Sequence, residues 1–143
     1  MKIKEIMTDN VATVSPETTV VEAARLMQRH DIGSLPVCEG PDLVGIVTDR
    51  DIVVRSVAHG QDITTTPVRE VMTRTVVTAS PETDVHQVAA LMSGQQIRRL
   101  PVVENNRLVG MVSLGDLATQ AKTEVEVATT LGEISQPAAP KRM

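Results

Sequence analysis

The pattern of apolar and polar residues changes its period in a fixed order along the first sixty residues. A short apolar run at 11–14 is followed by apolar residues at the helical spacing i, i+3, i+4 and i+7, namely Val20, Ala23, Ala24 and Met27. Two β-rich runs come next, Ser34–Cys38 and Leu43–Thr48, and a second helix is expected from Asp49 to about Ala58. The pattern therefore predicts the order strand, helix, strand, strand, helix.

Local signals place the boundaries of these elements. Thr19 precedes the first helix with Glu22 three positions later, which is typical of a capping box. Pro16 ends the first apolar run, because the residue before a proline is pushed towards extended geometry. Glu39-Gly40-Pro41-Asp42 has the chemistry of a tight turn, so the two β-rich runs are expected to form a hairpin.

The same pattern returns 65 residues later, as the step from Leu43 to Leu108 shows. This shift aligns residues 3–52 with residues 68–117 without a gap. The second copy has the same pattern with different residues. The cap is Asp84 with Gln87, the helical apolar residues are Val85, Val88, Ala89 and Met92, and the turn is 104–107. Repeated methionines, Met7, Met72, Met27 and Met92, are expected to fill gaps in the core.

A unit of about 50 residues rarely buries enough surface to be stable alone. We therefore expect an α/β (α+β) fold in which two tandem β-α-β-β-α units pack about a pseudo-two-fold axis. The predicted divisions are a first unit at 1–58, a linker at 59–67, a second unit at 68–122 and a C-terminal extension at 123–143. In that extension, Thr123–Leu131 is compatible with a short helix, and Gln136–Met143 is expected to be a frayed tail.

Composition excludes several classes of function. The 143 residues include no Phe, Tyr or Trp, so no ligand can be stacked on an aromatic ring. The net charge of −4 argues against a protein that binds nucleic acid phosphates. Without an apolar run of about 20 residues or a signal-like start, we expect a soluble cytoplasmic protein that does not bind membranes. The single cysteine, Cys38, is expected to be a small core residue.

Catalytic motifs are not found in the sequence. His30, His59 and His86 are scattered without a metal-ligand spacing, and no nucleophile elbow, phosphate-binding loop or C-x-x-C occurs. Gly45 and Gly110 fall inside predicted strands, where they indicate a close approach of another segment. We therefore expect neither an enzyme nor a metal site, with a metal or redox role of Cys38 and the histidines as a weaker alternative.

The most informative motif is the junction between the second β-run and the second helix. Thr48 and Asp51 stand there in the first copy, and Ser113 and Asp116 in the second. A hydroxyl followed three places later by a carboxylate is typical of a helix cap and requires no ligand. The same helix start can instead face a ligand, with the aspartate accepting hydrogen bonds from a ribose diol and the hydroxyl reaching ribose or phosphate. The two roles are compatible.

Three motifs recur in register in both copies. They are an apolar-Met-Thr start (Met7-Thr8, Met72-Thr73), a Leu-Pro-Val strand (35–37, 100–102) and G-h-h-[ST]-x-x-D (45–51, 110–116), where h is apolar. Over about residues 1–120 the chain resembles the CBS-domain pair, or Bateman module, and in particular its small stand-alone bacterial members. The resemblance implies a regulatory module that binds adenine nucleotides (AMP, ADP or ATP, in some members NAD or S-adenosylmethionine) in clefts between the copies. It also implies a homodimer and a regulated protein partner of unknown identity.

The candidate binding residues follow from this motif and its surroundings. Cations are unequal between the copies, since Arg50 follows Thr48 whereas Arg98 and Arg99 precede the second Leu-Pro-Val strand. We therefore expect two non-equivalent phosphate environments, although these arginines are equally compatible with solvated surface. The base would be bordered by Thr13 and Thr78 through backbone groups and by Pro36 and Pro101 as apolar walls, unless the prolines only edge a strand. The adenine nucleotide would be a regulatory ligand, and no obligatory cofactor is expected.

The alternative function is a structural or protein-interaction module without a ligand. In that case the Thr48–Asp51 and Ser113–Asp116 motifs are only helix caps.

Overall fold

The computed structural model describes residues 1–120 and 132–134, which divide into two compact units. The α1/α2 unit contains residues 10–76 and 105–108, and the α3/α4 unit contains residues 1–9, 77–104 and the described residues from 109 onward. The expected helix at Thr123–Leu131 and the expected tail at Gln136–Met143 lie outside the described residues.

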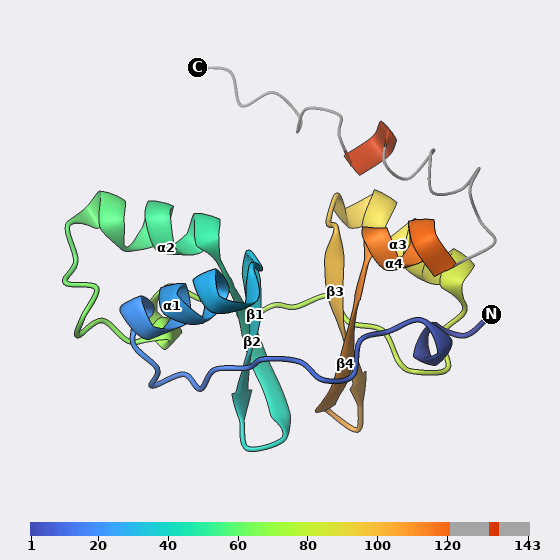
Figure 1. Cartoon of the computed structure of the whole chain (residues 1–143), viewed down its shortest axis with the longest axis horizontal. Helices are drawn as coiled ribbons and strands as arrows, with labels where there is room; N and C mark the ends of the chain where they lie inside the picture. The colour runs from blue at the N-terminus through green and yellow to red at the C-terminus, as the bar shows by residue number, and fades with distance from the viewer. Residues whose placement is uncertain (121–131, 135–143) are drawn as a thin grey trace. The chain divides into compact units, whose positions relative to one another are not determined.

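The α1/α2 unit is a β-hairpin covered on one side by two helices (Figure 1). Its elements are α1 (Val20–His30), β1 (Ser34–Glu39), β2 (Asp42–Thr48), α2 (Asp49–Arg55) and the 3-10 turns η2 (Val57–His59) and η3 (Val68–Glu70). The hairpin is antiparallel and runs in register from Ser34↔Thr48 to Glu39↔Asp42, with a bulge at Val37/Cys38. Gly40 takes φ 59° in its turn, a conformation that favours glycine.

The α3/α4 unit repeats this arrangement. Its elements are η1 (Ile3–Glu5), α3 (Val85–Gln95), β3 (Arg99–Glu104), α4 (Leu114–Gln120) and β4 (Arg107–Ser113), except that the first two residues of β4 belong to the α1/α2 unit. The turn between β3 and β4 has positive φ at Asn105 (52°) and Asn106 (65°), as a two-residue hairpin turn requires. The α/β class and the two tandem units predicted from the repeat are confirmed.

The strands predicted at the start of each copy are reduced to single bridges. Val14 pairs in parallel with Val37, and Ala79 pairs in parallel with Val102. The Val14 N–H donates to the Pro36 carbonyl (3.1 Å) and the Cys38 N–H to the Val14 carbonyl (2.8 Å). Because Pro36 has no N–H to donate, the edge of β1 offers a short ladder only.

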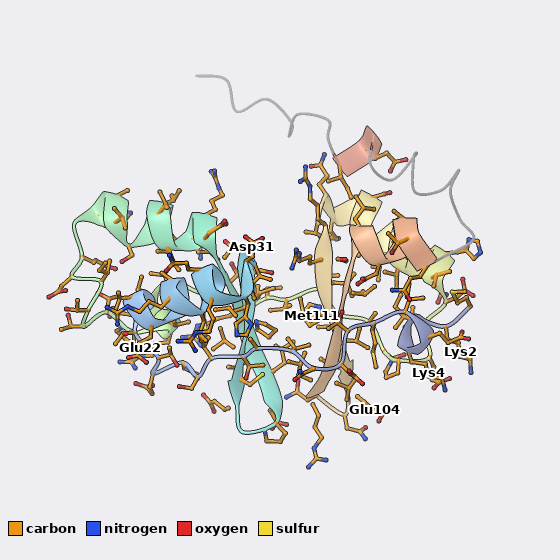
Figure 2. The ribbon with its side chains drawn as sticks, in the orientation of Figure 1. Lys2, Lys4, Glu22, Asp31, Glu104 and Met111 are labelled. Atoms are coloured by element: carbon orange, nitrogen blue, oxygen red, sulfur yellow. The ribbon has the colours of Figure 1, made fainter. Side chains whose placement is uncertain are left out.

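The predicted starts of α1 and α3 are correct, but neither cap is the predicted box. The Glu22 N–H donates to Thr19 Oγ1 (3.3 Å), and the Glu22 carboxylate accepts from the same hydroxyl (3.0 Å). At α3 the Asp84 carboxylate accepts from the His86 N–H (2.8 Å). Glu22 lies at the start of α1 and Asp31 beyond its end, where Asp31 takes φ 53° and closes the helix (Figure 2).

The second helix of the first copy is shorter than expected. It ends at Arg55, and Ser56 leads into η2, which Gly60 closes with φ 71°. The expected helix to about Ala58 is therefore an α-helix followed by a 3-10 turn.

The two copies exchange their first segments between the units. Ile3 and Ile6 of the first copy are buried in the core of the α3/α4 unit, together with Val88 and Leu100. Val68, Val71 and Met72 of the second copy are buried in the core of the α1/α2 unit. The compact units therefore do not follow the sequence copies at their starts, and the boundaries 1–58 and 68–122 stay a prediction about the repeat.

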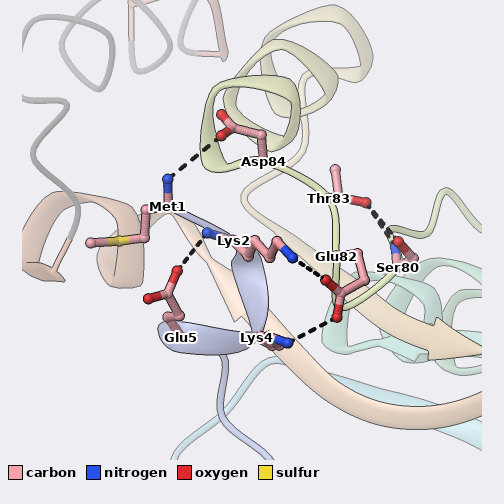
Figure 3. Close-up of polar contacts among 8 residues, drawn as sticks. All are labelled: Met1, Lys2, Lys4, Glu5, Ser80, Glu82, Thr83 and Asp84. Atoms are coloured by element: carbon pink, nitrogen blue, oxygen red, sulfur yellow. Dashed lines mark hydrogen bonds and ion pairs between the residues drawn. The ribbon is translucent and has the colours of Figure 1, made fainter.

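Each exchanged segment docks on the Ser-Pro-Glu-Thr turn of the other copy. In the α3/α4 unit the Ile3 N–H donates to the Thr83 carbonyl (2.8 Å), and Lys2 and Lys4 pair with Glu82 (2.5 and 3.0 Å; Figure 3). In the α1/α2 unit the Val68 N–H donates to the Thr18 carbonyl (2.7 Å), and Arg69 pairs with Glu17. The same contact is thus built twice.

Candidate functional site

The second helix of each unit begins with a reciprocal cap. The Asp51 N–H donates to Thr48 Oγ1 (3.0 Å), and the Thr48 N–H donates to Asp51 Oδ2 (3.0 Å). In the other unit the Asp116 N–H donates to Ser113 Oγ (3.1 Å), and the Ser113 N–H donates to Asp116 Oδ2 (2.8 Å). The predicted hydroxyl and carboxylate therefore meet in both units, and the capping interpretation of the motif is confirmed.

Each cap uses one oxygen of its carboxylate and leaves the other outside the cap. Asp51 is buried, with 9% of the residue exposed, and its Oδ1 lies 3.7 Å from Nε of Arg55. Because a carboxylate accepts up to four hydrogen bonds, the cap does not exhaust the capacity of Asp51 or Asp116 to bind donors.

The three candidate phosphate ligands lie on exposed positions. Arg50 is in the first turn of α2, Arg98 precedes β3, and Arg99 begins β3. The Arg98 carbonyl accepts from the Leu114 N–H (2.8 Å), as the Gly33 carbonyl accepts from the Asp49 N–H (2.9 Å). Exposure fits both the phosphate-binding interpretation and the solvated-surface interpretation of these arginines.

The two junctions also differ in the sizes of the residues at equivalent positions. A Cβ on Gly33 would stand 2.9 Å from Asp49 Oδ2, so a side chain at residue 33 would require the Asp49 carboxylate to shift. The second copy has Arg98 and Leu114 at these two positions. The two junctions therefore differ in shape as well as in charge.

The residues proposed to border a base have structural roles in the described chain. Pro36 and Pro101 are buried, and their carbonyls accept from the Val14 and Ala79 N–H groups (3.1 Å each). Thr13 is exposed and Thr78 is half-buried, each one residue before a bridge. Thr13, Pro36, Thr48, Arg50 and Asp51 belong to the α1/α2 unit, and Thr78, Pro101, Arg98, Arg99, Ser113 and Asp116 belong to the α3/α4 unit. Of these side chains, the described contacts join Thr48 to Asp51 and Ser113 to Asp116.

Cys38 has the character of a core residue. It is buried (8% exposed), and desolvation together with the nearby Asp42 raises the pKa of its thiol. Within residues 1–120 and 132–134, no cluster of three or more His, Cys, Asp or Glu side chains could hold a metal ion. None of the described helices has the length and apolar character needed to cross a membrane.

Comparison with known proteins agrees with the repeat and its motifs. The chain matches the CBS domain over residues 3–57 and again over residues 68–122. It belongs to the CBS domain family. It is 46% identical over 133 residues to the CBS domain-containing protein YhcV of Bacillus subtilis, covering 93% of this chain and 94% of YhcV. The CBS pair is thus nearly the whole of YhcV, which leaves no room for a separate catalytic domain.

Solved CBS structures show what related pairs bind and how they assemble. The CBS domain pair of MJ0100, in complex with 5-methylthioadenosine and S-adenosyl-L-methionine, is 33% identical with a TM-score of 0.73, covering 82% of this chain and 97% of that domain-pair chain. The hexameric CBS-CP12 protein of bloom-forming cyanobacteria is 35% identical with a TM-score of 0.74, covering 87% of this chain and 73% of that protein. Adenosyl ligands and oligomers therefore occur among CBS relatives.

Sequence reasoning missed Arg55 and the basic residues that hold the exchanged segments. Lys4 and Arg69 are both basic at equivalent positions, and Glu17 and Glu82 are both acidic. This matched pair of charges is a signal in the repeat, but it does not say that each pair forms across the two copies.

Proposed function

We propose that the chain is a regulatory module that binds adenine nucleotides (AMP, ADP or ATP, with NAD and S-adenosylmethionine as further candidates) and passes a conformational change to a protein partner. The observation that carries the proposal is the doubled Thr48–Asp51 and Ser113–Asp116 junction, in which one carboxylate oxygen stays outside each cap. The adenosyl ligands of MJ0100 support the same ligand class. The proposal includes a cytoplasmic homodimer without catalytic activity.

In this proposal the carboxylate oxygens that lie outside the caps accept hydrogen bonds from ribose hydroxyls. A carboxylate suits a diol and repels a phosphate, so the phosphates go to cations. Arg50 serves the first junction, and Arg98 with Arg99 serves the second. A single arginine against a pair gives the two sites unequal preference for highly charged phosphates.

A thermal-shift panel tests the proposal. Each nucleotide, NAD and S-adenosylmethionine is added to the full chain, with an external dye as reporter because the chain has no aromatic residue. A ligand at one hundred times its dissociation constant is expected to add about 2.7 kcal/mol of stability. A panel in which none of these compounds raises the melting temperature, repeated by calorimetry with the same result, contradicts the sensor function.

The second candidate is a ligand-free structural or protein-interaction module. The observation that favours it is the completeness of the caps, since Thr48, Asp51, Ser113 and Asp116 all have a structural task without a ligand. Small molecules that co-purify with the protein distinguish the two candidates, because only a sensor retains an adenine compound through purification.

A further inference from the structure

Arg55 joins the candidate site to the exchanged segment of the same unit. It stands in the last turn of α2, and 51% of its side chain is exposed. Its Nε lies 3.7 Å from Asp51 Oδ1, and its Nη1 donates to the carbonyl oxygens of Val71 (3.2 Å) and Met72 (3.4 Å). One guanidinium therefore contacts both the capping carboxylate and the backbone of residues 68–73, which we call the 68–73 segment.

The chemistry of arginine suits this double contact. A guanidinium presents five N–H donors in a rigid plane, so one edge can face a carboxylate while another donates to carbonyls. The carbonyls belong to the two residues that directly follow η3, Val71 and Met72, whose side chains are buried in the core. A change in the hydrogen bonds of Arg55 to these carbonyls therefore acts on a packed part of the unit.

The repeat supplies an internal comparison. Gln120 stands where Arg55 would be, 65 residues later, and Ile6 and Met7 stand where Val71 and Met72 are. Glutamine is neutral and cannot form an ion pair with Asp116. Among the described residues, a cation links the capping carboxylate to the exchanged segment in the α1/α2 unit only.

We propose that Arg55 is a positioning residue that couples Asp51 to the docking of the 68–73 segment. The inference rests on the proposed function only in that it gives a ligand at Asp51 a route to this segment. A ligand whose hydroxyl groups engage Asp51 Oδ1 alters the ion pair with Arg55, and thereby the hydrogen bonds to Val71 and Met72. Since such coupling is reciprocal, a loosened segment changes the affinity at Asp51 by the same factor.

Amide hydrogen exchange followed by NMR on the full chain tests the coupling without a ligand. Asp51→Asn keeps one oxygen for the Thr48 N–H but removes the charge that faces Arg55. We expect Asp51→Asn and Arg55→Gln each to speed exchange of the Met72 and Thr73 amides on the order of threefold. The double variant is expected to exchange no faster than Arg55→Gln alone, and Arg55→Lys to restore part of the protection.

The matched control is Asp116→Asn in the α3/α4 unit, which changes the same cap where the neutral Gln120 replaces Arg55 at the equivalent position. It is expected to leave exchange of the Met7 and Thr8 amides unchanged. Equal acceleration in the two units, or additive effects in the double variant, would overturn the proposal, because cap loss would then explain the data. If Arg55→Gln does not fold, the comparison of the two aspartate variants decides alone.

Addition of AMP separates this inference from the proposed function. In the wild-type chain AMP is expected to change exchange at Met72 and Thr73, whereas Arg55→Gln is expected to bind AMP without that change. Binding of AMP with no change at these amides in the wild type contradicts the coupling. If AMP binds to neither protein, nucleotide sensing through AMP fails, and the ligand-free comparison still decides the role of Arg55.

Discussion

The sulfur of Met72 lies 2.9 Å from the point where a Cβ on Gly45 would stand, and the carbonyl oxygen of Thr73 lies equally close. The Ile46 N–H donates to that carbonyl (2.9 Å), so the exchanged segment forms a backbone bridge on β2 directly over the glycine. Gly110 has the same relationship to Met7 and Thr8. The expected close approach at both glycines is confirmed, and the approaching chain is the start of the other copy.

Gly45→Ala is therefore expected to destabilise the protein by about 1–3 kcal/mol, because the methyl group overlaps a core side chain and a bonded carbonyl. Urea unfolding followed by far-ultraviolet circular dichroism measures the change. Gly94→Ala is the control, since a Cβ there meets nothing within 4 Å inside α3 and is expected to stabilise by up to ~1 kcal/mol. Equal stability of Gly45→Ala and the wild type would contradict the close packing.

Ile3→Ala is expected to weaken the α3/α4 unit, although Ile3 belongs to the first sequence copy. Ile3 is fully buried, and truncation of such a side chain costs about 2–5 kcal/mol. Amide exchange should accelerate in α3 and β3 more than in α1 and β1. Val68→Ala provides the mirror experiment, with the larger effect expected in α1 and β1; the opposite distribution in either variant would show that the segments are not exchanged.

Asp51→Asn and Asp116→Asn are each expected to weaken a different nucleotide-binding event by roughly tenfold to a hundredfold, the effect of losing hydrogen bonds to a charged acceptor. The unliganded proteins should lose little stability, because asparagine keeps an oxygen for the cap. Isothermal titration calorimetry gives the affinities and circular dichroism the stabilities. Unchanged affinities with lower stability would leave capping as the whole role of both aspartates.

The ion pairs of Glu82 predict how the docking of the N-terminal segment depends on pH. Hydrogen bonds from Lys2 and Lys4 hold the pKa of the Glu82 carboxyl below its ordinary 4.5, and the bond to Glu82 raises the pKa of Lys2 above 10.5. The stabilisation by Glu82 is therefore present above pH 4.5 and lost as the pH falls through its lower folded-state pKa. The stabilisation by Lys2 is present below pH 10.5 and lost as the pH rises through its higher folded-state pKa.

Melting temperatures of the wild type and Glu82→Gln measure this dependence between pH 2 and 7. The wild type is expected to be the more stable protein near neutrality, and the gap should close in acid and in high salt, since the groups are exposed. A gap that stays constant from neutral to acid pH would assign the effect of Glu82 to packing rather than charge.

Cys38 is expected to react slowly with a thiol reagent such as DTNB in the folded protein and rapidly in urea. Burial disfavours the thiolate, which is the reactive species, and so raises the pKa of the thiol. Absorbance of the released chromophore gives both rates. Fast reaction of the native protein would revive a redox role for Cys38.

Much of the fold could be predicted from the sequence because its signals are local and doubled. The helical spacing of Val20 and Met27, the turn at Gly40 and the junction at Thr48 each depend on residues close in the chain. The prediction of a strand at the start of each copy was wrong. A strand needs a partner to pair with, and in the first copy Pro36 leaves the neighbouring β1 without one N–H donor. The exchange of the first segments could not be predicted, because the sequence does not say whether basic residues such as Lys4 and Arg69 pair within their own copy or with the other copy.

The exchanged segments give the chain an obligate internal complementation. A separate first copy would carry Ile3 and Ile6 without the core they fill, and would lack Val68, Val71 and Met72 from its own. Because the two copies are joined in one chain, each completes the core of the other intramolecularly, with an effective concentration in the millimolar range for a short connection. Cleavage between residues 59 and 67 would replace that effective concentration by the actual one, so the cut halves should lose their structure on dilution.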